Sequence, residues 1–77
     1  MNAPVPTLAR MIRRRTCELG LTQRQAAALC GAGLRTWRAW AYGEAVPNVS
    51  SLAGLARLLG LPVEEVSRLR REQRRAR

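Results

Sequence analysis

The sequence predicts an all-α protein, a compact bundle of about five short helices. A chain of 77 residues supports one domain, and folding at this size buries only about 60% of the surface that the unfolded chain exposes. Phe is absent and the apolar residues are mainly Leu, Ala and Val, a composition that suits short helices better than a β-sandwich. Apolar residues also recur at helical spacing along segments that end in glycine.

The first helix is expected after a short N-terminal arm. Residues 1–6 contain two prolines and no periodic pattern, so we expect a flexible arm there. Thr7 is expected to cap a helix that ends near Gly20, with Arg13 and Arg14 on its solvent side. Its apolar positions, spaced by three, four and seven, are Leu8, Met11, Ile12 and Leu19.

Two further helices are expected in close succession. Residues 22–25, Thr-Gln-Arg-Gln, have the form of a capping box that begins a helix. That helix stops at Gly31, which can adopt the left-handed conformation that ends helices. After a turn of a few residues, a third helix is expected over residues 34–42, closed by Gly43 in the same way.

The C-terminal third predicts two more helices and a tail. Asn48 is expected to cap a fourth helix that ends at Gly60, and Pro62 suits the first turn of a fifth. The apolar stripe of the fourth helix consists of Val49, Leu52, Leu55, Ala56 and Leu59. Residues 70–77 have no apolar face, so we expect a basic tail that only a partner would order. The expected domain therefore covers residues 7–69.

The charge of the chain favours a polyanionic partner. All 14 basic residues are Arg and five residues are acidic, which gives a formal net charge of +9. A GC-rich genome can account for the choice of Arg over Lys, but it does not explain the net charge.

The cysteines and the apolar segments exclude several classes of function. Cys17 and Cys30 are the only cysteines and there is no His, so neither a zinc site nor a Cys/His nucleophile pair can form. We expect both thiols to be buried and reduced, with a disulfide as the alternative. No stretch resembles a signal peptide or a membrane span, so a cytoplasmic protein without a membrane partner is expected.

Residues 22–43 have the organisation of a helix-turn-helix, in which the second helix enters the DNA major groove. At this point the chain resembles the lambda-repressor-like, or XRE, family of phage repressors and bacterial transcriptional regulators, over about residues 8–66. The matching residues are Gly20-Leu21-Thr22-Gln23, Ala27, Gly31, Trp37, Trp40, Gly43, Pro47 and Leu59-Gly60-Leu61. Many members pair an Arg of the first helix with a Glu of the third, whereas this chain has Thr16 and Ala41 there. Because both partners are missing, no buried charge is left unpaired.

The resemblance implies a sequence-specific, double-stranded DNA-binding transcriptional regulator, most simply a repressor, that contacts the major groove with helix 34–42. It implies that Gln23 contacts a phosphate. Arg24 beside it adds a full charge to a helix N-terminus, which already attracts anions. Trp37 matches a buried family position, and we expect Trp40 beside it in the core, with stacking on unpaired bases as the alternative for both.

The third helix is expected to present one stripe to DNA. Spacings of three, four and seven place Arg35, Arg38, Ala39 and Tyr42 together. For Arg35, bidentate pairing with guanine is expected first. Arg38 suits a base or a phosphate equally, and Tyr42 suits a phosphate. The remaining two candidates, which could touch a thymine methyl or pack locally, are Leu34 and Thr36.

A homodimer on a two-fold operator is expected, because one helix-turn-helix contacts few base pairs. By resemblance to members that pair through C-terminal helices, the candidate interface is Leu61, Val63, Val66 and Leu69. The alternative is that these residues close the monomer's own core. Two other functions stay open: an antitoxin that holds a small toxin protein through the arm or the tail, and a less specific nucleic-acid-binding module. We expect no cofactor and no enzymatic activity, since the sequence shows no His, no paired catalytic carboxylates and no phosphate loop.

Overall fold

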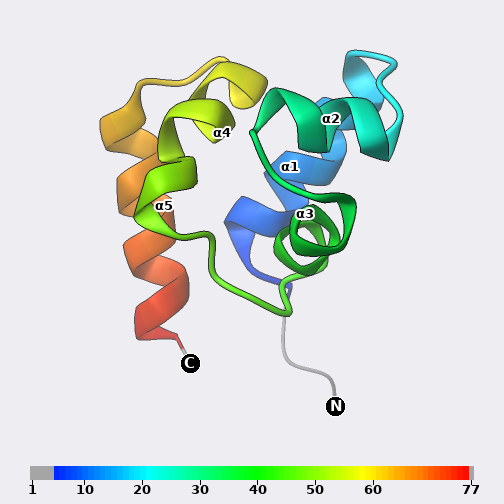
Figure 1. Ribbon diagram of the computed structural model, residues 1–77. Helices are drawn as coiled ribbons and strands as arrows, with labels where there is room; N and C mark the ends of the chain where they lie inside the picture. Colours follow the sequence, from blue (N-terminus) through cyan, green and yellow to red (C-terminus); the bar gives the residue numbers. More distant parts are fainter. Residues whose placement is uncertain (1–4, 77) are drawn as a thin grey trace.

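Five α-helices and one short 3-10 turn make up the computed structural model, which describes residues 5–76 (Figure 1). The elements are α1 (Thr7–Glu18), α2 (Gln23–Leu29), α3 (Leu34–Ala41), the 3-10 turn η1 (Val49–Ser51), α4 (Leu52–Leu59) and α5 (Val63–Arg75). No strand occurs in the described part of the chain. The all-α prediction is therefore confirmed.

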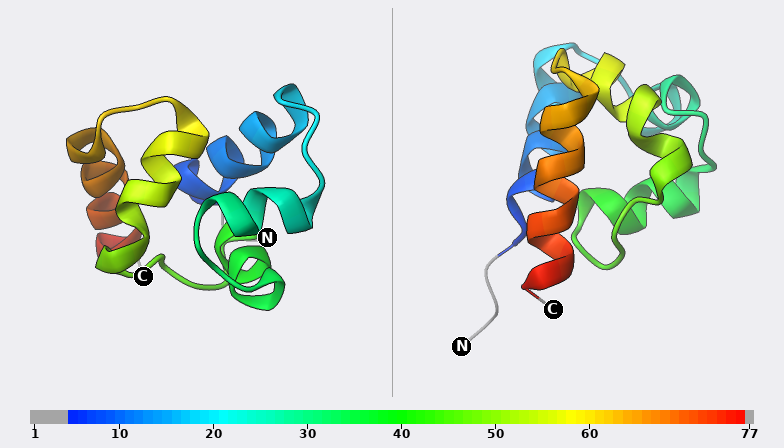
Figure 2. Two further views of the ribbon diagram at one scale, coloured as in Figure 1. Left: turned by 45° about the horizontal axis from the view of Figure 1, so that its top comes forward. Right: turned by 90° about the vertical axis from the view of Figure 1, so that its left-hand side faces the viewer.

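Helix α1 lies at the centre and packs against α3, α4 and α5. Helices α2 and α3 form a closely packed pair on one side, and α4 and α5 lie beside each other on the other side (Figures 1 and 2). The long loop from α3 to η1 connects the two sides.

One hydrophobic core joins all five α-helices. Its largest fully buried side chains come from every helix except α2, and they include Leu8, Ile12, Trp37, Leu55, Leu58 and Val66. Helix α2 contributes small residues, Ala26 and Ala27, which are also buried. Small side chains let α2 approach its neighbours closely, which brings the turn between α2 and α3 against the core.

Helix α4 approaches the backbone at the end of α2 closely. A Cβ atom at Gly54 would stand 2.7 Å from the Cα and 2.9 Å from the carbonyl oxygen of Cys30. No side chain can move aside there, because the neighbour is backbone. Glycine at this position therefore lets α4 lie this close to the turn that leads to α3.

Burial also raises the pKa of the Cys30 thiol to about 11.

The cysteines differ from expectation in one respect. Cys30 is buried as predicted, but Cys17 is exposed on α1. Both thiols are free, so the disulfide alternative does not apply. Cys17 follows the buried Thr16 by one residue, and this rotates its side chain about 100° away from the core-facing side of the helix.

Two helix starts also differ from expectation. Pro6, not Thr7, precedes α1, and the Thr7 side chain makes no capping hydrogen bond. Asn48 precedes the 3-10 turn rather than an α-helix, and its Oδ1 accepts from the hydroxyls of Ser50 and Ser51 at 3.2 and 2.6 Å. Val49 consequently lies in the 3-10 turn, 65% exposed, instead of joining the apolar stripe of α4.

The expected arm is only partly described, since residues 1–4 lie outside the described residues. Val5 is exposed. Pro6 packs tightly on Gly43, where a Cβ atom would stand 2.6 Å from the Pro6 Cδ. Gly43 also has a φ of +73°, so both its backbone and its neighbour favour glycine.

The expected tail is helical over most of its length, because α5 continues to Arg75. Two of its residues hydrogen-bond the α3–η1 loop: Arg70 Nε donates to the Pro47 carbonyl at 2.6 Å, and Gln73 Nε2 donates to the Ala45 carbonyl at 3.3 Å. These hydrogen bonds to loop carbonyls hold the segment in place, although it has no apolar face of its own.

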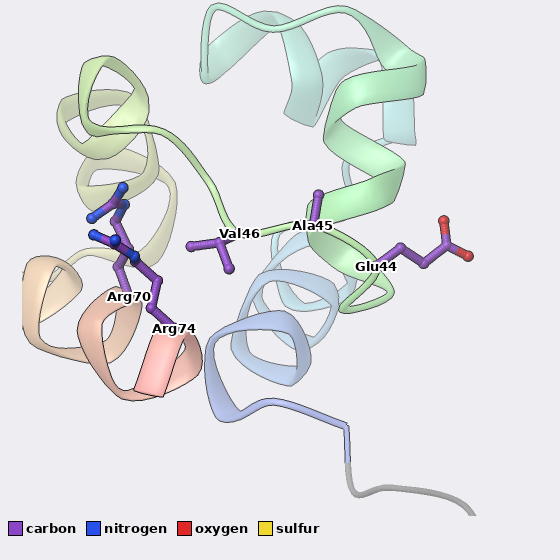
Figure 3. A pocket seen from close by; sticks show the side chains of 5 residues that line it. All are labelled: Glu44, Ala45, Val46, Arg70 and Arg74. Carbon is purple, nitrogen blue, oxygen red and sulfur yellow. The ribbon is translucent and has the colours of Figure 1, made fainter. Parts of the chain in front are cut away.

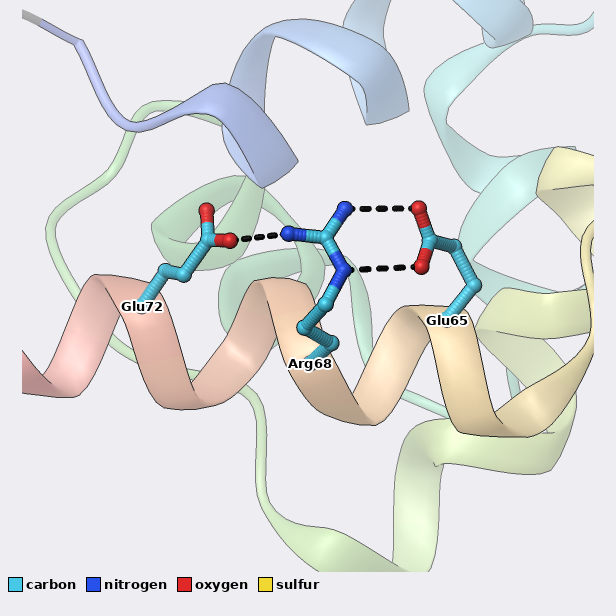
Figure 4. A network of polar contacts seen from close by, with 3 residues as sticks. All are labelled: Glu65, Arg68 and Glu72. Atoms are coloured by element: carbon cyan, nitrogen blue, oxygen red, sulfur yellow. Dashed lines mark hydrogen bonds and ion pairs between the residues drawn. The ribbon is translucent and has the colours of Figure 1, made fainter.

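Charged side chains along α5 also stabilise its outer surface. Arg68 bridges Glu65, one turn before it, and Glu72, one turn after it (Figure 4). The hydrogen bond from Arg68 lowers the pKa of Glu65, and the two carboxylates raise that of Arg68. Pairs at this spacing stabilise helices modestly.

Candidate nucleic-acid interface

The α2–turn–α3 segment forms as its local sequence predicts. The backbone N–H of Gln25 donates to Thr22 Oγ1 at 3.0 Å, and the backbone N–H of Thr22 donates to Gln25 Oε1 at 2.8 Å. This capping box begins α2. At its other end, Gly31 has a φ of +70° and allows the chain to turn into α3 within a few residues.

Helix α3 has one buried and one exposed face. Trp37 and Trp40 are only 1% and 3% exposed, and Ala41 is fully buried. The burial of both indoles confirms their place in the core and leaves them unavailable for stacking on bases. The other faces carry the candidate DNA contacts: Arg35, Thr36, Arg38 and Tyr42 are exposed and Ala39 is half-buried, while half-buried Leu34 lies at the edge of the buried face, seven residues before Ala41. The side chains that could reach a groove therefore point away from the core.

The two other candidates lie at the start of α2. Arg24 is exposed in the first turn, and Gln23 is half-buried. Gln23 connects the two helices: its Oε1 accepts from Arg38 Nε at 2.8 Å, and its Nε2 donates to the Tyr42 hydroxyl at 3.4 Å. The structure thus brings Gln23, Arg38 and Tyr42 into one cluster of polar side chains. The Arg38 guanidinium is held by Nε, so its terminal nitrogens stay available for a ligand.

The structure adds Arg13 of α1 to this cluster. Its guanidinium carbon lies 5.2 Å from the centre of the Tyr42 ring, a cation–π distance. Arg13 Nε is buried and has no hydrogen-bond partner among the described residues. Arg13 and Arg14 were both expected on the solvent side of α1, but Arg13 is half-buried and only Arg14 is exposed. No local pattern links positions 13 and 42, so only the packing of α1 on α3 could reveal this contact.

The interface is strongly positive because its arginines have no acidic neighbours. Within the described chain, ion pairs form between Arg14 or Arg15 and Glu18, and between Arg68 and its two glutamates. The five remaining guanidinium groups of helices α1–α3 form no ion pair within the described chain, and they belong to Arg10, Arg13, Arg24, Arg35 and Arg38. Unneutralised charges gathered on one face attract a polyanion.

The positions that differ from the family pattern are satisfied without charge. Thr16 and Ala41 are both buried, and the Thr16 hydroxyl donates to the Ile12 carbonyl at 2.7 Å. The site where other members hold an ion pair therefore contains no unpaired charge.

The candidate dimer residues fall into two groups. Val66 and Leu69 are 0% and 5% exposed and belong to the core of their own chain, which is the alternative that the sequence left open. They cannot also face a second chain. Leu61 packs partly on the core, and Val63 is 42% exposed at the start of α5.

No helix in residues 5–76 combines the length and the apolar character needed to span a bilayer. The same residues contain no group of three or more His, Cys, Asp or Glu side chains placed to hold a metal ion.

The comparisons with known proteins agree with this geometry. A family model described as a helix-turn-helix domain matches residues 7–69. No curated protein and no solved structure matches the chain at a significant level. The matched segment includes α2, the turn and α3, together with the helices that support them. The helix-turn-helix domain points to DNA binding, and it is consistent with the lambda-repressor-like resemblance over about residues 8–66. Because the model covers most of the sequence, the chain belongs to the helix-turn-helix domain family.

Proposed function

We propose that this protein is a transcriptional regulator that binds a specific sequence in double-stranded DNA with α3 in the major groove. The observation that carries the proposal is the two-sided character of α3, which buries both tryptophans and exposes Arg35 and Arg38 without an acidic neighbour. A rigid helix of this kind can present Arg35 to the paired acceptors of a guanine edge while Arg38 contacts the flanking phosphate backbone.

Each exposed residue has a distinct role in this proposal. Arg35 lies in the first turn of α3 and pairs with a guanine, because its side chain is exposed and unpaired. Half-buried Leu34 and Ala39, with Thr36 between them, line the groove and contact thymine methyl groups.

The cluster around Gln23 serves phosphates rather than bases. Arg38, Tyr42 and Arg24 surround the N-terminus of α2, where free backbone amides and partial positive charge favour an anion. Gln23 holds Arg38 and Tyr42 in place through its side-chain amide. These contacts fix the position of α3 in the groove without selecting a sequence.

We further propose that two chains bind a two-fold operator. One helix-turn-helix contacts few base pairs, and a dimer doubles the contacts, with half-sites about 34–36 Å apart. Val63 and the exposed part of Leu61 are the residues of the expected interface that a second chain can reach. A dimer that occupies the groove excludes other proteins from the same DNA, which is the action of a repressor.

Selection of bound sequences from random duplex DNA tests this function. We expect enrichment of a two-fold motif with guanines at fixed positions and half-sites separated by about one helical turn. Enrichment of an unrepeated half-site would contradict the dimer but keep sequence-specific binding. Equal recovery of all sequences, or equal affinity for RNA and duplex DNA, would contradict the proposed function itself.

A further inference from the structure

A second basic site lies outside the α2–α3 surface, between the α3–η1 loop and the last turns of α5. It is an open hollow of about 640 Å³, lined by Glu44, Ala45, Val46, Arg70 and Arg74 (Figure 3). Both arginines lie in the segment expected to be a tail without a fixed structure, and the function proposed above does not use them.

The loop that forms one wall of the hollow is held on both sides. At its start, the amides of Glu44 and Ala45 both donate to the Ala39 carbonyl of α3, at 2.8 and 3.1 Å. On the other side, Arg70 Nε and Gln73 Nε2 donate to loop carbonyls at 2.6 and 3.3 Å. The hollow is therefore built in advance, and its wall is fixed to the same helix that is proposed to enter the groove.

The two arginines of the hollow lack the neutralisation that their neighbour has. Arg68 is paired with two glutamates, but neither Arg70 nor Arg74 forms an ion pair within the described chain. They stand four residues apart on α5, a spacing at which like charges repel. The one carboxylate that lines the hollow, Glu44, points away from both guanidinium groups (Figure 3). An anion bound between them would relieve this repulsion.

We propose that Arg70 and Arg74 form an anion site that binds a backbone phosphate of the duplex that α3 enters. Arg70 uses Nε for the Pro47 carbonyl, so its four terminal N–H groups stay available, and Arg74 offers all five. Such forks match the oxygens of a phosphate group. The inference rests on the proposed DNA binding, and it extends the contact from the α2–α3 surface to α5.

The source of the phosphate follows from the attachment of the loop to α3. The loop wall is bonded to the carbonyl of Ala39, a residue of the α3 stripe that is proposed to face DNA, and a free phosphate would not need that attachment. DNA is therefore the phosphate source that we propose, and free phosphate is the alternative that the experiment separates.

The first experiment measures the salt dependence of duplex binding for Arg74→Ala, with Arg71→Ala as the matched control. Arg71 carries the same charge on the same helix, but it donates to Ser67 Oγ and does not line the hollow. We expect Arg74→Ala to weaken binding to every duplex and to reduce the slope of log K against log salt by about one. The control is expected to keep the wild-type slope. Equal slopes for the two variants would overturn the proposal.

The second experiment follows the Arg Nε–Hε signals by NMR in the full chain, first with inorganic phosphate and then with a bound duplex. We expect the signals of Arg70 and Arg74 to shift with both probes, and the Arg70 shift to be lost in Arg74→Ala. A shift with inorganic phosphate but not with the duplex would overturn DNA as the source.

These outcomes also separate the second site from the proposed function. Sequence-specific duplex binding that is unchanged in Arg74→Ala would remove only the second site. A wild-type protein that binds no duplex would contradict the proposed function, and with it the assignment of the phosphate to DNA.

Discussion

Helices α3 and α5 both carry arginines on their outer faces, yet Arg68 of α5 is paired within the chain and the arginines of α3 are not. Arg35 and Arg38 on α3 have no carboxylate nearby, whereas Arg68 on α5 lies between two glutamates. The same residue type therefore stabilises a helix in one place and is left open to a ligand in the other. Net charge alone does not indicate which surface binds DNA. The candidate surface is indicated by which guanidinium groups have no carboxylate partner.

The sequences of the two helices explain this difference. α5 has Glu64 and Glu65 in its first turn and two arginines in its last, which complements the helix dipole. α3 has no acidic residue in its first turn, so its N-terminus keeps its partial positive charge. Its own charged side chains therefore help to stabilise α5. The stability of α3 depends instead on the burial of its two tryptophans.

The largest expected effect breaks the inner face of α3. Trp37→Ala removes a side chain that is 1% exposed and should lower the free energy of unfolding by about 3–5 kcal/mol. Urea unfolding followed by far-UV circular dichroism measures this loss. An exposed residue of the same helix, changed in Thr36→Ala, serves as the control. A Trp37→Ala protein as stable as the control would show that α3 does not depend on its buried face.

The next effect separates the outer faces. Arg35→Ala should cost about 1–3 kcal/mol of affinity for the selected operator and relax the sequence preference at one position of each half-site. Competition binding against operators that carry single base-pair changes measures both effects. An unchanged preference at every position would remove Arg35 from base recognition, whatever the loss of affinity.

A smaller effect tests whether α1 extends the α3 surface. We propose that the guanidinium held on Tyr42 contacts a phosphate, so Arg13→Ala should weaken binding to all duplexes alike and reduce the salt slope by about one. The matched control is Arg14→Ala, since Arg14 is the next residue on the same helix and pairs with Glu18 instead. Equal slopes for the two variants would place Arg13 outside the interface.

The smallest effect concerns the paired arginine of α5. Arg68→Ala should leave DNA affinity unchanged and remove a small, acid-sensitive part of the stability. Because Arg68 lowers the pKa of Glu65 in the folded state, the contribution of Glu65 is present above its ordinary pKa of 4.5 and disappears as the pH falls through the lowered value. Thermal unfolding between pH 6 and 2, compared for wild type and variant, measures this difference. A large loss of DNA affinity would contradict the division between arginines paired with glutamates and arginines left unpaired.

The parts of the fold that depend on local sequence were predictable. The capping box at Thr22, the glycine stops and the helical spacing of the tryptophans determine α2 and α3 almost residue by residue. These signals act within one turn of helix, so the sequence displays them directly. The split of α3 into a buried and an exposed face follows from the same spacing.

The parts that depend on contacts between distant segments were not predictable. The order of α5 beyond Leu69 comes from Arg70 and Gln73 bonding a loop more than 20 residues earlier. The contact of Arg13 with Tyr42 and the approach of Gly54 to Cys30 likewise join separate helices. Periodicity does not indicate which carbonyl or ring a long side chain will reach.

The composition of α3 has a practical consequence for solution work. The chain contains two Trp, one Tyr and no Phe, and all three aromatic residues lie within positions 37–42. Intrinsic fluorescence and near-ultraviolet dichroism therefore originate from α3 and from Tyr42, the residue that ends it. With both indoles shielded from water and the phenol half-exposed beside the cluster at Gln23, emission reports unfolding of this helix and phenol absorbance reports occupation of its outer surface, without any label.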